Sequence, residues 1–223
     1  MATKLKIGTE VLLKGNNYRW LGAQWARVGS RGKTTKMATK SASIKLTTQA
    51  IKKNVLKTKI NKKDAGSSMK WFNDQIEKTT SKFKEVTKPR VGGMYTYGYD
   101  PKGKKTLPYY DKFPLIILVK PYKDGFLGLN VHYLSPANRD KFFTAMLKFT
   151  GKKDPALLTE KDLFDINWNK VAKVPLVEKT VHRYLFNLVK TKLVEIGPQE
   201  WEASIYLPTA KFKGASQKEV WSS

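Results

Sequence analysis

The fold is decided by residues 113–133, which read FPLIILVKPYKDGFLGLNVHY. Residues 113–119 form a continuous apolar run, the pattern of a strand that is covered on both faces. Lys123-Asp124-Gly125 then supplies a hairpin turn, and the strand-forming residues 126–133 follow it directly. The stretch therefore predicts an antiparallel β-hairpin whose first strand is buried.

Strand-forming residues also precede this hairpin. Residues 94–99 read MYTYGY, which is rich in aromatic strand formers, and Asp100-Pro101-Lys102-Gly103 is a turn sequence. Three strands with short connections imply a small antiparallel sheet.

Helix signals lie on both sides of the predicted sheet. Ser135-Pro136 is a favourable helix N-terminus, and the apolar stripe that follows it ends at Gly151. The residues from Thr159 to Asp162 resemble a capping box. Helices are expected over about 69–86, 136–151, 159–168 and from Pro175 to about Lys192. These elements predict an α+β body, a small antiparallel β-hairpin sheet packed with several helices.

The helix expected over 69–86 combines bulky apolar residues with lysines. That pattern is compatible with a membrane surface, whereas aromatic residues at helical spacing are also ordinary core contacts.

Positive charge is the dominant feature of the composition. The chain carries 43 Lys and Arg against 18 Asp and Glu, a formal net charge of +25. Residues 1–63 hold 16 of these cations and one acid, Glu10, which gives this part +15. Nucleic acid, anionic lipid and acidic proteins are the partner classes that such a charge attracts. We expect an extended basic N-terminal arm at residues 1–66 and an α+β body domain at 67–223.

The cations of the arm are spaced along it, which suits a backbone of phosphates. Double-stranded DNA is the partner that we expect, bound with little sequence preference. A solvated tail without a partner is the alternative, although the aromatic anchors Tyr18, Trp20 and Trp25 are unusual in a disordered tail. The candidate nucleic-acid-binding residues are Arg19, Arg27, Arg31, Lys33, Lys36, Lys40, Lys52, Lys53, Lys57, Lys59, Lys62 and Lys63.

Signatures of catalysis and metal binding are missing from the sequence. There is no cysteine, which removes thiolate nucleophiles, disulfides and Cys-based zinc sites. The two histidines, His132 and His182, lie far apart in the chain, and no glycine pattern matches a P-loop or a dinucleotide-binding fingerprint. A metal-dependent nuclease needs clustered carboxylates, whereas the aspartates near the sheet stand beside turns, lysines or a helix start. These aspartates are Asp100, Asp111, Asp124 and Asp140. We therefore expect no catalytic residues, no cofactor and no metal.

Several unusual sequence blocks of the body form one pattern. Their centre is TLPYYDKFPL at 106–115, flanked by GMYTYGYDPK at 93–102 and by DGFLGLN at 124–130 with HYL at 132–134. Trp201-Glu202, LPT at 207–209, Phe212 and Val220-Trp221 continue the pattern. Over about residues 68–223 the chain resembles the DNA end protector proteins of large contractile-tailed (T-even type) bacteriophages, whereas the arm before residue 64 carries no such likeness.

The resemblance implies a virion protein that binds the ends of the packaged linear genome and shields them from host exonuclease without catalysis. It implies a protein made in the host bacterial cytoplasm, with portal, neck or tail subunits as partners and no membrane. Trp71, Tyr109 and Tyr110 are the aromatic residues that we expect to cover a terminal base pair, although a Tyr-Tyr pair at a strand edge can also pack simply on a helix. The alternative is a structural neck or baseplate protein whose basic arm threads between other subunits.

Overall fold

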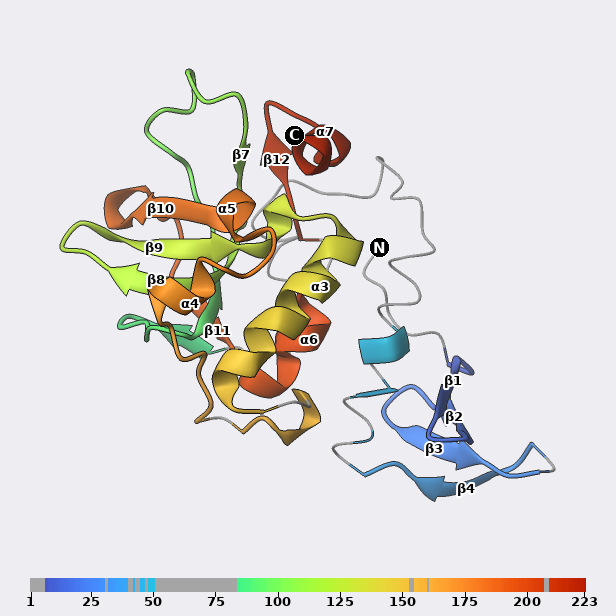
Figure 1. The fold of residues 1–223 in the computed structure, drawn as a ribbon. Coiled ribbons are helices and arrows are strands. Elements are labelled where there is room, and N and C mark those ends of the chain that lie inside the picture. The colour runs from blue at the N-terminus through green and yellow to red at the C-terminus, as the bar shows by residue number, and fades with distance from the viewer. Residues whose placement is uncertain are drawn as a thin grey trace. The chain divides into compact units, whose positions relative to one another are not determined.

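The computed structural model describes residues 7–30, 32–39, 42, 45–46, 48–50, 84–152, 155–159, 161–206 and 209–223. The chain divides into two compact units, residues 1–65 and 66–223. In Figure 1 the described strands of the first unit are blue and the second unit runs from green to red.

The first unit contains a four-stranded antiparallel sheet with its strands in sequence order. Its strands are β1 (Glu10–Leu13), β2 (Asn16–Trp20), β3 (Trp25–Val28) and β4 (Thr34–Met37). Lys14 and Gly15 form the two-residue turn between β1 and β2, and both have the positive φ of a tight hairpin, 49° and 73°. This turn fixes the register in which Leu13 pairs with Asn16.

Trp25 is the centre of the core of this unit. It is fully buried together with Leu46 and Ala50, and the partly buried Val11 and Tyr18 pack against them. Residues 10–37 are therefore a folded sheet and not the extended arm expected from the sequence, because their apolar side chains share a core.

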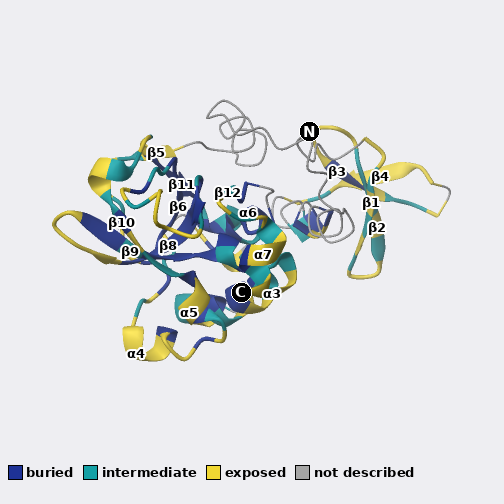
Figure 2. Ribbon diagram, turned by 90° about the horizontal axis from the view of Figure 1, so that it is seen from above, coloured by how far each residue is buried: buried dark blue, intermediate teal, exposed yellow. Residues whose placement is uncertain are grey.

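The second unit is built on a six-stranded antiparallel sheet with the strand order β10-β9-β8-β6-β11-β5. The strands are β5 (Lys84–Val86), β6 (Met94–Thr96), β8 (Leu115–Pro121), β9 (Gly125–Asn130), β10 (Val181–Leu185) and β11 (Leu193–Ile196). A separate pair joins β7 (Tyr110–Asp111) to β12 (Phe212–Lys213). The hairpin predicted from residues 113–133 is confirmed as β8 and β9, and most of both strands is buried, as Figure 2 shows.

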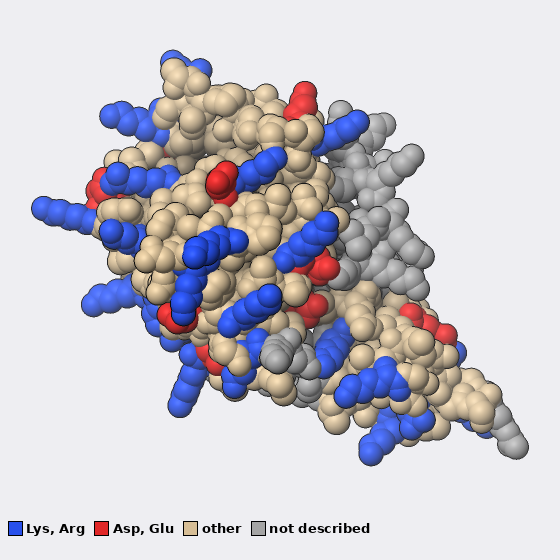
Figure 3. All heavy atoms as spheres, in the orientation of Figure 1, with Lys and Arg blue, Asp and Glu red and all other residues tan. Residues whose placement is uncertain are grey.

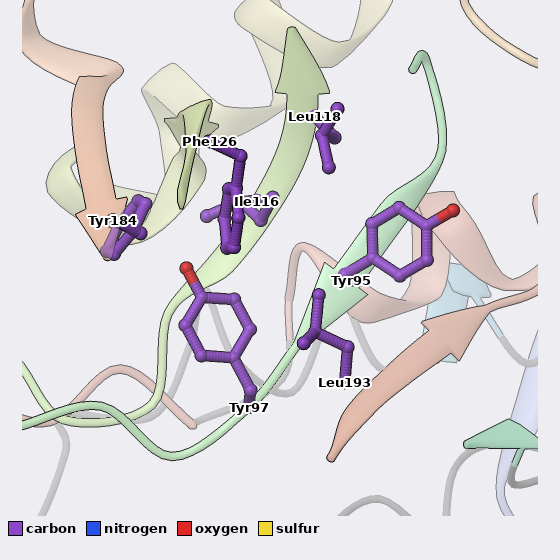
Figure 4. Close-up of a cluster of buried hydrophobic side chains, with 7 residues drawn as sticks. All are labelled: Tyr95, Tyr97, Ile116, Leu118, Phe126, Tyr184 and Leu193. Carbon is purple, nitrogen blue, oxygen red and sulfur yellow. The ribbon is translucent and has the colours of Figure 1, made fainter. Parts of the chain in front are cut away.

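One face of this sheet carries an aromatic core. Tyr97 lies at its centre, with its ring edge-on to Phe126 at 5.7 Å and to Tyr184 at 5.6 Å (Figure 4). Burial of these large rings stabilises the sheet through apolar area and through edge-to-face contacts. The cluster consists of Tyr95, Tyr97, Ile116, Leu118, Phe126, Tyr184 and Leu193.

Short helices complete the second unit. The longest one in the described residues is α3 (Pro136–Leu147), where the Ser135 side chain accepts a hydrogen bond from the Asn138 amide. It is tied to the end of α6 (Trp201–Ser204) by the buried Arg139, which donates to the Ile205 carbonyl at 3.1 Å. The other α-helices in the described part of this unit are α4 (Trp168–Val171), α5 (Val177–Thr180) and α7 (Gln217–Ser222). The 3-10 helices are η2 (Val131–Tyr133), η3 (Lys148–Thr150), η4 (Pro155–Leu157), η5 (Phe186–Leu188) and η6 (Pro198–Glu200).

The α+β class and the helix expected over 136–151 are confirmed, the latter as α3 and η3 with Gly151 in the left-handed conformation at its end. The helix expected over 159–168 is wrong. The Asp162 carboxylate accepts hydrogen bonds from both the amide and the hydroxyl of Thr159, which is one half of a capping box, but residues 161–167 do not continue it as a helix.

The helix expected from Pro175 to Lys192 is also wrong beyond Thr180. Residues 181–185 pair with β9 as strand β10, because the open edge of β9 offers backbone partners that periodicity alone does not reveal. Of the helix expected over 69–86, residues 69–83 lie outside the described residues, and 84–86 form β5 beside β11.

Candidate nucleic-acid interface

The described cations of the first unit differ in whether a carboxylate neutralises them. Arg19 forms an ion pair with Glu10, at 2.8 Å between Nη2 and Oε1, and this carboxylate neutralises it. Arg27, Lys33 and Lys36 are exposed on or beside β3 and β4. The other predicted DNA-binding residues, together with Trp71, lie outside the described residues: Arg31, Lys40, Lys52, Lys53, Lys57, Lys59, Lys62 and Lys63.

The second unit has an aromatic pocket of about 1030 Å³ next to the loop that connects β6 to β7. The loop stands above β10 and α5, and α7 lies on its other side (Figure 1). Six aromatic rings line the pocket: Tyr99, Tyr109, Tyr110, Tyr133, His182 and Tyr184. This size is at the upper end of the range for pockets that bind small organic ligands.

Three of these rings are half-buried and follow one another along the pocket. The Tyr133 and His182 rings lie 3.9 Å apart between centroids, and Tyr109 lies 6.1 Å from Tyr133. Tyr109 is held in place by its hydroxyl, 3.0 Å from Ser223 Oγ, and by the Phe212 ring, which it meets edge-on. The pocket therefore offers flat, fixed ring surfaces of the kind on which nucleic-acid bases stack.

The formal charges of the side chains that line the aromatic pocket sum to zero. The three cations are Lys102, Lys179 and Arg183, and the three carboxylates are Asp111, Asp124 and Glu178. Arg183 is held by both carboxylate oxygens of Asp124, at 2.7 and 2.9 Å.

A second pocket, the lysine pocket, has a volume of about 560 Å³. Its lining includes Lys104, Lys105, Lys112, Lys190 and Lys213. Asp100 is the one carboxylate in this lining, so five lysines against one aspartate leave a net charge of +4. Tyr99 and Tyr110 line both pockets, which makes these two side chains the wall between them.

Backbone pairing brings the lysines together from distant parts of the chain. The Lys190 amide donates to the Gly98 carbonyl at 2.8 Å, and Lys213 lies opposite Tyr110 in the β7–β12 pair. Lys104 is tied to Asp100 by an ion pair of 2.8 Å. Figure 3 shows further Lys and Arg side chains spread over the drawn face of the second unit, with few Asp and Glu among them.

The two predicted tyrosines have different surroundings. Tyr110 is in β7 and only 8% exposed, whereas Tyr109 is half-buried and lines the aromatic pocket. Burial, and then the negative charge of Asp100, raise the pKa of Tyr110. At neutral pH its hydroxyl therefore stays protonated. The pocket lysines were missed in the sequence, where only the adjacent Lys104 and Lys105 gave a local signal.

A buried polar network supports the wall. The Asp111 carboxylate lies 2.7 Å from His132 Nδ1 and accepts from Asn130 Nδ2 at 3.1 Å, and His132 Nε2 lies 3.2 Å from the Thr209 hydroxyl. Burial lowers the pKa of His132, so the ring is neutral, with its Nδ1 proton donated to Asp111. Burial opposes ionisation of Asp111, but His132 and the Asn130 amide hold the pKa of this carboxyl below its ordinary value.

The arrangement of Asp111, His132 and Thr209 has the order of a nucleophilic triad, but all three side chains are buried, at 3%, 0% and 2% exposure. Each of the four aspartates weighed above is engaged: Asp100 with Lys104, Asp111 with His132, Asp124 with Arg183 and Asp140 with Tyr206. Within the described residues no three His, Asp or Glu side chains gather as metal ligands. None of the helices in the described part of the chain has the length and apolar character needed to cross a bilayer.

Comparison with known proteins finds one matching protein family. The protein family described as phage T4 terminal DNA protecting protein matches residues 26–223. No curated protein and no solved structure matches the chain. The family match confirms the resemblance seen in the second unit and extends it into the first, since it begins in β3. The chain belongs to the family of the phage T4 terminal DNA protecting protein.

Proposed function

We propose that the protein is a non-catalytic component of the phage particle that binds the ends of linear double-stranded DNA and shields them from exonuclease. The family match over residues 26–223 carries this proposal. Portal, neck or tail subunits are the neighbours that the proposal gives it in the particle.

The charge of the chain supports DNA as the partner. With a net charge of +25, the protein attracts phosphates at long range and gains affinity from the counterions that they release. This attraction is independent of sequence, as protection of any terminus requires. Specificity for an end must come from another feature, because the sides of a duplex carry the same phosphates.

The test is protection of linear DNA from an exonuclease that digests from ends. Linear DNA with a saturating amount of the protein should survive, whereas DNA with an equally basic control protein should be degraded. Incubation with Mg²⁺ and no exonuclease should leave the DNA intact. Equal protection by the control protein would contradict end binding, and Mg²⁺-dependent cleavage would contradict the non-catalytic part.

A further inference from the structure

We infer that the lysine pocket and the aromatic pocket together hold the last, unpaired nucleotide of a DNA strand, with its phosphate on the lysines and its base among the rings. This inference rests on the proposed function and names the surface that recognises the end.

The lysine pocket has the charge for a phosphate. Lys105, Lys190 and Lys213 are exposed, and no ion pair with a described carboxylate is formed by any of these three. A phosphate placed among these ammonium groups would relieve their mutual repulsion and release its own counterions.

The aromatic pocket has the opposite character and fits the other half of a nucleotide. Its walls carry no net charge, so it offers no second phosphate site. Its half-buried rings, Tyr109, Tyr133 and His182, present π-surfaces that every base can stack on.

The shared residues join the two halves. Tyr99 and Tyr110 line both pockets, so the two pockets are direct neighbours. The isolated bridge from Tyr99 to Val189 and the pairing of Tyr110 with Lys213 fix this wall to the elements that carry the lysines.

A strand end is the part of DNA that such a surface can take. Bases within a duplex are stacked and paired, and extruding one costs a few kcal/mol, whereas an unpaired base costs least. Frayed or overhanging ends supply unpaired bases, and closed duplex does not. The site therefore distinguishes an end from the sides of a duplex, which backbone contacts alone cannot do.

The phosphate half is tested with Lys190→Gln combined with Lys213→Gln. The matched control is Lys141→Gln combined with Lys170→Gln, which removes two exposed lysines of the same unit that line neither pocket. Binding is measured by anisotropy on a short duplex with a single-stranded overhang and an internal fluorophore, with linear or closed circular plasmid as competitor. Linear plasmid should compete better than circular plasmid for the wild-type protein and the control. The pocket variant should lose this preference and bind the overhang at least about fivefold more weakly, with a salt slope reduced by about 0.7, the contribution of one phosphate on a single strand.

The base half is tested with Tyr109→Leu against Tyr109→Phe. The phenylalanine variant loses the hydroxyl contact with Ser223 but keeps the ring, so it should bind the overhang more tightly than the leucine variant. The leucine variant should bind the overhang about fivefold or more weakly, the usual effect of losing one stacked base. In the wild-type complex, 2-aminopurine at the strand terminus should be quenched by stacking, and 2-aminopurine inside the duplex should not change.

The outcomes separate the two proposals. Wild-type protein that fails to protect linear DNA overturns the proposed function. Wild-type protein that protects DNA, while both pocket variants match their controls in end preference, overturns this inference alone. The inference is also overturned if terminal 2-aminopurine is unaffected by the wild-type protein, a measurement that does not depend on any variant folding.

Discussion

Asp111 is the residue that holds the pocket wall in position. Its carboxylate accepts hydrogen bonds from the amides of Phe113 and Lys211 and from the Asn130 side chain, and it contacts the His132 ring. These groups come from the segment after β7, from β9 and η2, and from the segment before β12. Since Tyr110 precedes Asp111 in β7, the buried carboxylate also fixes the side chain that separates the two pockets.

Replacing Asp111 by Asn should therefore act on stability. We expect a loss of about 3 kcal/mol in the free energy of unfolding, because a buried charge with several donors is removed. Asp124→Asn is the control, since that carboxylate is 60% exposed in its ion pair with Arg183 and is worth less than about 1 kcal/mol. Urea unfolding measures both. Equal losses would contradict the role of Asp111, and loss of a Mg²⁺-dependent cleavage in either variant would instead indicate a nuclease.

His132 and His182 should make the protein sensitive to mild acid. Burial lowers the pKa of His132 and of His182 below the ordinary value of 6.5, so the unfolded chain binds protons more readily than the folded one. Their contribution to stability is complete above about pH 6.5 and is lost as the pH falls through the folded pKa values. The lowered pKa of Asp111 acts in the same direction, but only below its ordinary value of 3.8.

Urea unfolding at several pH values between 7.5 and 5 tests this expectation. The free energy of unfolding should decrease over this range in the wild-type protein and should decrease less in His132→Gln, which has one titrating ring fewer. An equal decrease in both proteins would show that His132 does not contribute.

Among the elements, those that form from local signals could be predicted. The hairpin of β8 and β9 needs only its apolar run and its turn, and α3 needs only Ser135, Pro136 and its apolar stripe. In contrast, β5 and β10 exist because β11 and β9 offer them an edge to pair with. Pairing partners far apart in sequence leave no periodic signal, and the helical pattern over Val177–Thr180 misled the prediction for the residues after it.

The β9–β10 pairing also explains a glycine. A Cβ at Gly125 would lie 2.0 Å from the Tyr184 carbonyl oxygen, so Gly125→Ala should force β10 away from the sheet and destabilise the protein by about 3 kcal/mol. Gly128→Ala is the matched control in the same strand. Its Cβ would lie 3.1 Å from Cβ and Cδ1 of Ile116, a milder overlap than the one with a backbone oxygen, so the loss should be clearly smaller than for Gly125→Ala. Thermal unfolding compares the two, and similar melting temperatures would contradict the close approach.

For the whole molecule, the sequence located the charge but not the candidate site. Tyr109 and Tyr110 could be named because they are consecutive in an unusual block. The lysine pocket could not, because Lys104, Lys190 and Lys213 come from three distant segments that only the folded chain brings together. The charge distribution along the sequence therefore pointed to residues 1–63 and gave no sign of the smaller cluster of lysines in the lysine pocket.

Salt dependence should separate general attraction from end recognition. If about six phosphates are neutralised, a log-log plot of affinity against salt should have a slope of about −5 on closed circular DNA. An open end should make this slope steeper by at most about 1. Titrations of the full chain from low to physiological salt on circular and linear plasmid provide both slopes. A slope near zero on either DNA would contradict a phosphate-binding protein.

The contacts of Ser223 have a practical consequence for anyone who handles the protein. Its hydroxyl meets Tyr109 and its carbonyl accepts from Lys179, while Trp221 in the preceding helix α7 donates to the His132 carbonyl at 2.9 Å. A purification tag or fluorescent fusion joined after this residue would emerge at the rim of the aromatic pocket and compete for its opening. Labels are better attached through an exposed side chain such as Lys141, which lines neither pocket and leaves that opening clear.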